Sequence, residues 1–116
     1  MKEFKRSERV SDLLYREVSN ILLRDIKDPR VEMVTVTGTR VSDDLRHALV
    51  FYSVIGDDRR WTEVAQGLKS SKGYVKRELG KRLKMKYLPD LKFVEDRTME
   101  KGEKMDMLLS DLTKNG

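Results

Sequence analysis

A long helical pattern from Trp61 to Met85 places the strongest constraint on the fold. Its apolar residues recur at helical spacing along one side of the segment: Trp61, Val64, Ala65, Leu68, Val75, Leu79 and Leu83. Poor helix formers crowd between Gly67 and Gly73, and each glycine costs about 1 kcal/mol relative to alanine in a helix. We therefore expect two helices joined by a kink or short turn at Ser71-Lys72-Gly73.

A first helix is predicted from about Ser7 to about Ile26. Its apolar stripe consists of Val10, Leu13, Leu14, Val18, Ile21 and Leu22. Ser7 suits the N-cap, because its hydroxyl oxygen can accept a hydrogen bond from an amide of the first turn. Pro29 disfavours helical geometry at Asp28, so the helix should end before that residue.

Three strands are predicted around the long helical pattern. The first, Glu32 to Val41, is rich in valine and threonine, and its alternation slips near Gly38, which indicates a bulge. The second, His47 to Val54, is apolar on both faces, so the pattern leaves its buried face open. The third is short, from Leu91 to Val94.

The predicted order is α-β-β-α-α-β. It is followed by a short terminal helix from Met105 to Leu112 and a flexible end from about residue 113. A chain of 116 residues is long enough for one hydrophobic core, so residues 1–116 should form a single domain. This order predicts an α+β domain whose helices cover one face of a mixed three-stranded sheet.

Positive charge is concentrated in one part of the chain. Between Lys69 and Lys86 there are eight basic residues and one acidic residue, Glu78, whereas the whole chain carries a net charge of only +5. Ordinary solvated helix faces mix lysine with glutamate, so this imbalance favours a surface that binds a polyanion such as RNA or DNA. The predicted contact set is Lys69, Lys72, Lys76, Arg77, Lys81, Arg82 and Lys84, with a weaker second patch at Lys5, Arg6 and Arg9.

The residues needed for catalysis or metal binding are scarce. The chain contains no cysteine and one histidine, His47, so we predict no catalytic residue, no metal site and no cofactor. The pairs Asp43-Asp44 and Asp57-Asp58 could ligate a hard cation, as in a metal-dependent nuclease, but adjacent aspartates more often form turns. Trp61 should lie in the core, and Tyr74, off the apolar stripe, could stack on a base.

The targeting signals of other compartments are missing from this sequence. The charged N-terminus lacks the apolar stretch of a secretory signal, and no segment approaches the roughly 20 apolar residues that span a bilayer. We expect a cytoplasmic protein that does not contact membranes.

The predicted element order, with a glycine between paired helices, is typical of KH-like domains. The G-x-x-G loop of ordinary KH domains is absent, and Ser71-Lys72-Gly73 stands in its place. Gly73 is therefore expected to allow two helices to pack at an angle rather than to contact an RNA backbone.

In this setting the chain resembles the bacterial ribosome-binding factor A family from about Arg6 to Leu112. The resemblance is carried, in order, by Arg9-Val10, Arg16-Glu17-Val18, Ile21-Leu22, Lys27-Asp28-Pro29-Arg30, Val34-Thr35-Val36-Thr37, Val41-Ser42, Asp44-Leu45, Ser53-Val54 with Gly56, Gly73, Arg77, Leu79, Arg82-Leu83, Pro89, Leu91 with Phe93, Asp96 and Leu108-Leu109. The family has an Ala-x-Gly kink in place of the G-x-x-G loop, and Ser71 stands here for the alanine.

The resemblance implies a type II KH-like fold with a helix–kink–helix. It also implies a non-enzymatic factor that binds the immature small ribosomal subunit near the 5′-terminal helix of its ribosomal RNA. Such a factor assists late maturation, matters most in the cold, acts as a monomer and has a functional link to assembly GTPases. The alternative that remains open is a general nucleic-acid-binding KH-like module without a ribosome role.

Overall fold

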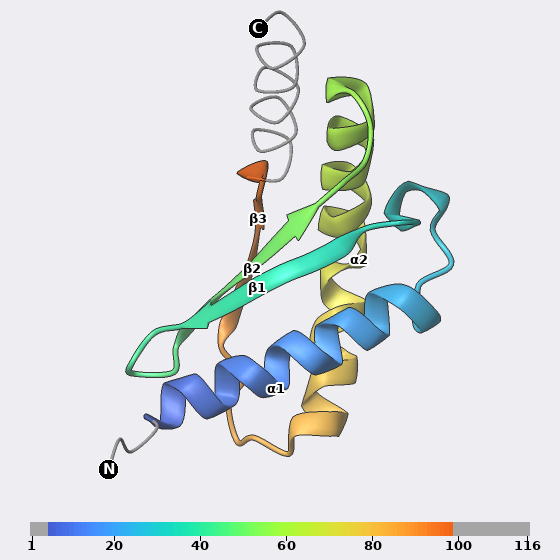
Figure 1. The fold of residues 1–116 in the computed structure, drawn as a ribbon. Helices are drawn as coiled ribbons and strands as arrows, with labels where there is room; N and C mark the ends of the chain where they lie inside the picture. The colour runs from blue at the N-terminus through green and yellow to red at the C-terminus, as the bar shows by residue number, and fades with distance from the viewer. Residues whose placement is uncertain (1–4, 99–116) are drawn as a thin grey trace, which may run out of the picture.

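The structure is a computed structural model that describes residues 5–98. In chain order it contains α1 (Arg6–Asn20), the π-helical turn η1 (Ile21–Asp25), the 3-10 turn η2 (Pro29–Val31), β1 (Thr35–Val41), β2 (His47–Ser53), α2 (Asp58–Leu83) and β3 (Asp90–Glu95) (Figure 1). The predicted terminal helix from Met105 to Leu112 and the end from about residue 113 lie outside the described residues.

The three strands form the predicted mixed sheet in the order β1-β2-β3. β1 and β2 are antiparallel, and β2 and β3 are parallel. The pairing passes from Val36 opposite Tyr52 to Gly38 opposite Phe51, so Thr37 is the extra residue of a bulge, as the slipped alternation predicted. The bulge returns Val41 to the buried face of the sheet.

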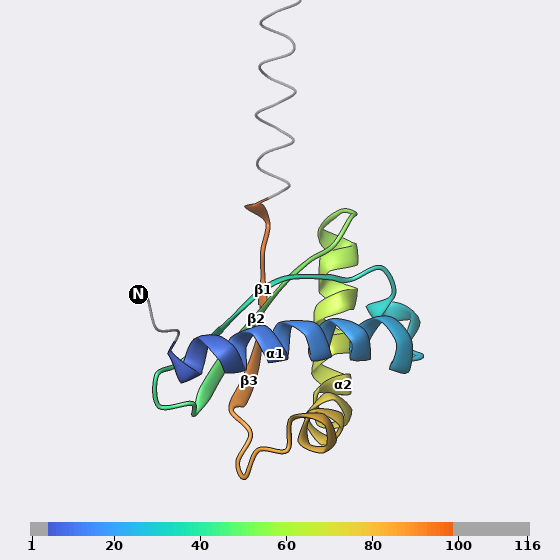
Figure 2. The same ribbon diagram turned by 60° about the horizontal axis from the view of Figure 1, so that its bottom comes forward.

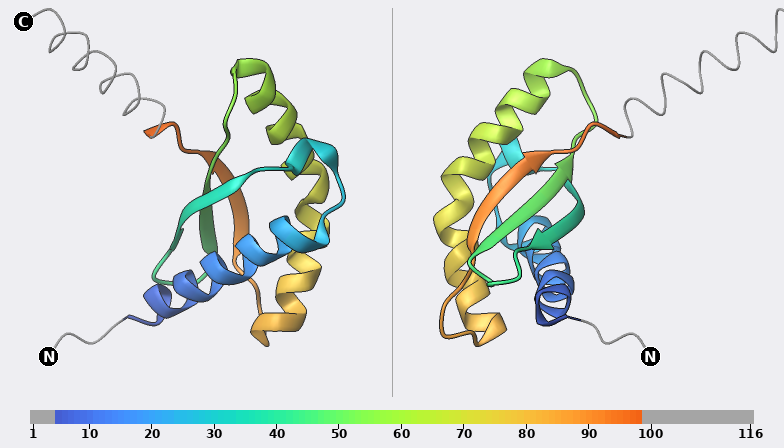
Figure 3. Two further views of the ribbon diagram at one scale, coloured as in Figure 1. Left: turned by 45° about the vertical axis from the view of Figure 1, so that its right-hand side comes forward. Right: turned by 90° about the vertical axis from the view of Figure 1, so that its left-hand side faces the viewer.

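The helices settle which face of β2 is buried. α1 packs chiefly on β1, and α2 lies beside β3 (Figure 3). On β2 the residues Ala48, Val50 and Tyr52 are buried beneath the helices, whereas Leu49 and Phe51 on the other face are half-exposed. The sheet therefore has one covered face and one face without a helix in the described part of the chain.

The start of α1 differs from the prediction. Lys5, not Ser7, is the N-cap, and it has no side-chain capping hydrogen bond. Ser7 lies inside the first turn, where it is buried, and its hydroxyl donates to Asp43 Oδ1 at 3.3 Å. The prediction of Ser7 as N-cap was wrong because the hydroxyl has a tertiary partner in the β1–β2 loop, which the local pattern could not reveal.

The expectation of two helices joined by a kink or short turn at Ser71-Lys72-Gly73 is met only in part, because the axis of α2 bends but no break divides it in two (Figure 2). α2 is one continuous helix of 26 residues. Figure 2 shows its first part lengthwise and its last part nearly end-on, so the helix axis changes direction without a break. Serine and glycine lower helix propensity but keep their backbone N–H groups, and the apolar stripe is buried at Leu68 and again at Val75, so tertiary packing maintains the helix.

The glycine that α2 needs for packing is Gly67. A Cβ atom there would lie 2.8 Å from Val31 Cγ2 and 2.9 Å from Arg30 Cβ, whereas a Cβ at Gly73 would have no heavy atom within 4 Å. The η2 turn that approaches Gly67 is itself held by Asp28, which accepts hydrogen bonds from Arg30 N at 2.9 Å and from its guanidinium at 2.7 Å. This turn fills the space that the missing side chain leaves.

The core lies between the sheet and the two helices. Trp61 is its largest fully buried side chain, as the apolar stripe predicted, and its ring centroid is 5.9 Å from that of Tyr52. The Arg97 guanidinium lies 4.4 Å from the indole centroid, a cation–π contact that covers the core where β3 ends.

The two glycines give a test of the packing within one helix. We expect Gly67→Ala to lower the free energy of unfolding by about 1–3 kcal/mol, because the new methyl group overpacks against η2. Gly73→Ala should raise it by up to about 1 kcal/mol through the higher helix propensity of alanine. Urea denaturation of both variants measures the difference, and a strongly destabilised Gly73→Ala would show that the bend of α2 requires glycine.

Candidate nucleic-acid interface

The predicted contact residues on α2 divide into three groups by the side of the helix that they occupy. The first group is Lys69, Lys72 and Lys76, which lie three and four residues apart and so share one side. Lys72 Nζ and Lys76 Nζ are 4.0 and 3.8 Å from Asp90 Oδ1 at the start of β3. Solvent-exposed pairs of this kind are weak, so both ammonium groups remain available to an RNA phosphate.

The second group points away from the core. Arg77, Lys81 and Lys84 are exposed on the side of α2 opposite the buried stripe. Lys81 Nζ is 3.6 Å from Glu78 Oε1, while Arg77 forms no ion pair within residues 5–98. Lys84 caps α2 in the left-handed conformation, with φ of 50°, and thereby turns the chain out of the helix. This group offers positive charge directly to solvent.

The third group is a single residue, Arg82, which forms ion pairs with other parts of the fold. Its guanidinium lies 2.6 Å from Asp25 Oδ2, 3.4 Å from Glu17 Oε2 and 3.8 Å from Glu78 Oε2. The hydrogen bond that Arg82 donates to Asp25 is the main cause that raises the pKa of Arg82. Arg82 thus joins the end of α2 to α1 and η1, and we infer that it positions the basic helix rather than contacting RNA.

The structure places the weaker N-terminal patch next to the first group. Arg6 and Lys76 line the same surface hollow, which has a volume of about 570 Å³. Lys5 Nζ is 3.8 Å from Asp43 Oδ2, and Arg9 is exposed one turn further along α1. Two segments that the sequence treats as separate patches therefore meet at one end of the molecule.

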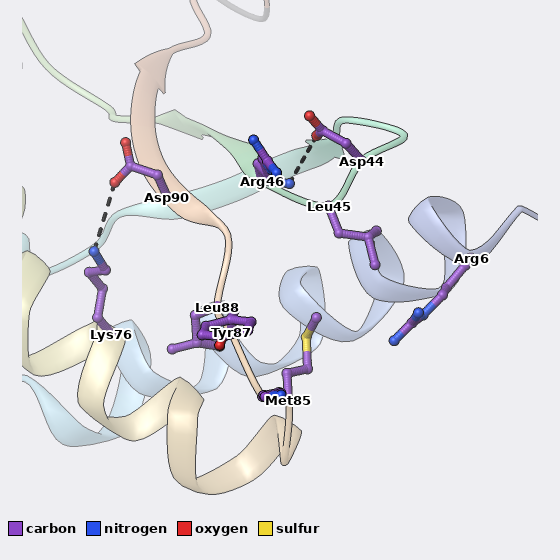
Figure 4. Close-up of a pocket in the computed structure, with 10 residues that line it drawn as sticks. Arg6, Asp44, Leu45, Arg46, Lys76, Met85, Tyr87, Leu88 and Asp90 are labelled. Atoms are coloured by element: carbon purple, nitrogen blue, oxygen red, sulfur yellow. Dashed lines mark hydrogen bonds and ion pairs between the residues drawn. The ribbon is translucent and has the colours of Figure 1, made fainter.

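The sequence reasoning missed three residues at this end. Arg46 and Tyr87 also line the hollow (Figure 4), and so does Lys86. Tyr87 is 77% exposed, whereas Tyr74, for which the sequence left base stacking open, is half-buried and packs against the core. Tyr87 belongs to no helical or strand pattern and lies two residues before Pro89. This position in a predicted connection could have marked it as an exposed aromatic residue.

The aspartate pairs act as turn formers. Asp44 Oδ1 accepts a hydrogen bond from Arg46 N at 3.0 Å, and Asp57 Oδ1 accepts one from Arg60 N at 3.1 Å as the N-cap of α2. His47 is exposed at the start of β2. Within residues 5–98, no group of three or more potential ligands could hold a metal ion, and no helix is long and apolar enough to cross a bilayer.

Comparison with protein families places nearly the whole chain in one of them. The family described as Ribosome-binding factor A matches residues 6–109. Ribosome-binding factor A from Syntrophus aciditrophicus is 46% identical over 112 residues, which are 97% of this chain and 91% of that protein.

Solved structures of similar fold carry the same name. The crystal structure of ribosome-binding factor A from Thermus thermophilus aligns with a TM-score of 0.70 and 22% identity, covering 79% of this chain and 97% of the other. Coordinates of the Thermus thermophilus factor, fitted into a cryo-electron microscopy map of a 30S complex, align with a TM-score of 0.61 and 23% identity, covering 74% and 90%. The KH-like fold that the sequence predicted is confirmed.

Arg77 and Arg82 provide a test of the division between exposed and structural basic residues. Arg82→Ala should lower the free energy of unfolding, because it leaves Glu17 and Asp25 close together without their shared cation. Arg77→Ala should leave it unchanged within error. Denaturation at low and at high salt measures both effects. The loss for Arg82→Ala should shrink in high salt, and equal stability of the two variants would contradict a structural role.

Proposed function

The chain belongs to the ribosome-binding factor A family, and we propose that it binds the small ribosomal subunit through ribosomal RNA. The observation that carries this proposal is the exposed basic surface of α2, made by Lys69, Lys72, Lys76, Arg77, Lys81 and Lys84. Lysine and arginine side chains neutralise RNA phosphates and release condensed counterions, which supplies affinity without reading sequence. The relative fitted into a map of a 30S complex supports the same partner.

The mechanism that we propose is non-catalytic. A protein that binds one conformation of an RNA more tightly than another shifts the equilibrium between them by the ratio of its two affinities. The bent, continuous α2 provides a rigid charged surface for this purpose, and Arg82 fixes its angle relative to α1. Binding alone would then favour a mature arrangement of the ribosomal RNA.

The finer part of the proposal concerns the RNA segment and the stage of assembly. By family membership, we place the contact near the 5′-terminal helix of the ribosomal RNA and the action in late maturation, before translation. The protein would act as a single chain in the cytoplasm, with its greatest effect in the cold and with a functional link to assembly GTPases. None of these steps requires a bound cofactor.

A second candidate function is general nucleic-acid binding without a ribosome role. It is favoured by the chemistry of the α2 surface, because phosphate contacts by lysine and arginine carry no sequence information. Affinity for small subunits, generic RNA and duplex DNA at the same salt concentration separates the two functions.

We predict that Lys69→Glu/Arg77→Glu weakens small-subunit binding by about tenfold or more, since two phosphate-neutralising charges are reversed. The matched control is Arg40→Glu/Lys92→Glu, which makes the same change in charge at exposed positions on β1 and β3. Both control residues flank Leu49 on the face of the sheet without helices. Co-sedimentation with immature and mature small subunits measures the binding of all three proteins.

Circular dichroism shows whether both double variants remain folded. Equal weakening in the two variants would mean that total charge, not the α2 surface, determines binding. If the wild-type protein binds small subunits no better than generic RNA or duplex DNA, the ribosome-specific function fails and the general module remains.

A further inference from the structure

The hollow at the end of α2 is built by four separate segments of the chain. Arg6 comes from the start of α1, Asp44 to Arg46 from the β1–β2 loop, Lys76 from α2, and Met85 to Asp90 from the connection into β3. Figure 4 shows these side chains around one open space. Its volume of about 570 Å³ lies in the range of about 300–1,000 Å³ that is usual for small-ligand sites.

The charges of this hollow favour an anion. Four basic and two acidic side chains line it. Both carboxylates already have partners: Asp90 is paired with Lys72 and Lys76, and Asp44 accepts from Ser42 Oγ at 2.6 Å and from Arg46 N at 3.0 Å. The hydrogen bond from Ser42 is the main cause that lowers the pKa of Asp44.

The remaining basic side chains of the hollow are Arg6, Arg46 and Lys86. Within the described part of the chain, the side chains of Arg6, Arg46 and Lys86 form no salt bridge. Asp44 remains ionised and interacts electrostatically with Arg46, so the side chains that line the hollow have an excess of two positive charges, which attracts an anionic group that enters.

The same hollow contains an apolar floor and an aromatic ring. Leu45, Met85 and Leu88 are partly buried against the core and form the floor. Tyr87 is 77% exposed, and Lys86 Nζ lies 5.6 Å from its ring centroid. A hollow with cations, an apolar floor and an accessible ring matches both parts of a nucleotide, the phosphate and the base.

The backbone explains why Tyr87 is presented to solvent. Lys84, with φ of 50°, turns the chain out of α2, and the fully buried Pro89 anchors it again before β3. Between these two points Met85 and Leu88 pack partly against the core, whereas Lys86 and Tyr87 are exposed to solvent. The backbone that carries Tyr87 is thus held on both sides.

We propose that this hollow binds one unpaired nucleotide of single-stranded RNA, with the base stacked on Tyr87 and the phosphate held by Arg6, Arg46 and Lys86. This inference rests on the proposed function and specifies its substrate as RNA with an unstacked base. Lys76 belongs to both surfaces, so an RNA strand on the lysine row of α2 would continue into the hollow. Aromatic stacking of unpaired bases is a common mode of RNA recognition.

The test is fluorescence titration of a short single-stranded RNA that carries one 2-aminopurine, whose emission falls when it stacks on a ring. We expect the wild-type protein to quench this emission and Tyr87→Leu to weaken binding about tenfold. Tyr87→Phe should bind within twofold of wild type, because it keeps the ring. The control Tyr15→Leu removes another exposed tyrosine, on α1 and outside the hollow, and should change nothing.

Three competitors distinguish the possible sources of the nucleotide. An unlabelled RNA of the same sequence should displace the probe at far lower concentration than free adenosine monophosphate, and its fully paired duplex should be a poor competitor. Displacement by adenosine monophosphate as readily as by the strand would overturn the RNA assignment and indicate a site for free nucleotides.

The outcome also separates this inference from the proposed function. Absence of quenching by the wild-type protein, or unchanged affinity of Tyr87→Leu, would overturn the nucleotide site. If the same wild-type protein still co-sedimented with small subunits, the proposed function would stand without it. Loss of both activities would remove both proposals.

Discussion

The burial of the apolar stripe of α2 is the interaction on which the rest of the structure depends. Trp61, Leu68, Val75 and Leu79 are all at most 1% exposed, and they hold α2 against the sheet and α1. Because this one stripe faces the core, the opposite side of the helix must face solvent. The lysine and arginine residues on that side are therefore displayed together, and no separate element is needed to arrange them.

Two structural devices fix the position of this helix. Gly67 allows the η2 turn to approach the α2 backbone, and Arg82 bridges the last turns of α2 to Glu17 and Asp25. Both residues act through contacts with segments that are distant in the sequence. Within the sequence of α2 alone, Gly67 is only a poor helix former and Arg82 is only one more basic residue. The same helix thus carries two kinds of basic residue: exposed ones, for which we propose contact with a polyanion, and Arg82, which pairs with acidic residues of α1 and η1.

Much of the fold could be predicted from the sequence because its determinants are local. The strands, the bulge beside Gly38 and the burial of Trp61 follow from periodicity. The errors occurred where distant residues decide the outcome. Ser7 binds Asp43 rather than capping α1, and packing on both sides of Gly73 keeps α2 continuous. The KH-like fold did not depend on either detail.

The candidate site was predicted less completely for the same reason. The basic row on α2 follows from helical spacing, but the hollow forms only when α1, the β1–β2 loop and the segment before β3 meet. Arg46, Lys86 and Tyr87 belong to no periodic pattern, so only the tertiary structure groups them with Arg6 and Lys76. The ion pairs of Arg82 with Asp25 and Glu17 are equally invisible in the sequence, because these partners are 57 and 65 residues away.

The most direct test of the α2 surface uses the absence of cysteine from the chain. A single Ser70→Cys variant places a thiol on the exposed side of α2 next to Lys69, and Lys92→Cys places one on the sheet face without helices. Tethered iron–EDTA at each position cleaves nearby ribosomal RNA in bound small subunits. If the α2 surface binds ribosomal RNA, cleavage should be strong and localised from residue 70 and weak from residue 92. Strong cleavage from residue 92 with none from residue 70 would contradict it.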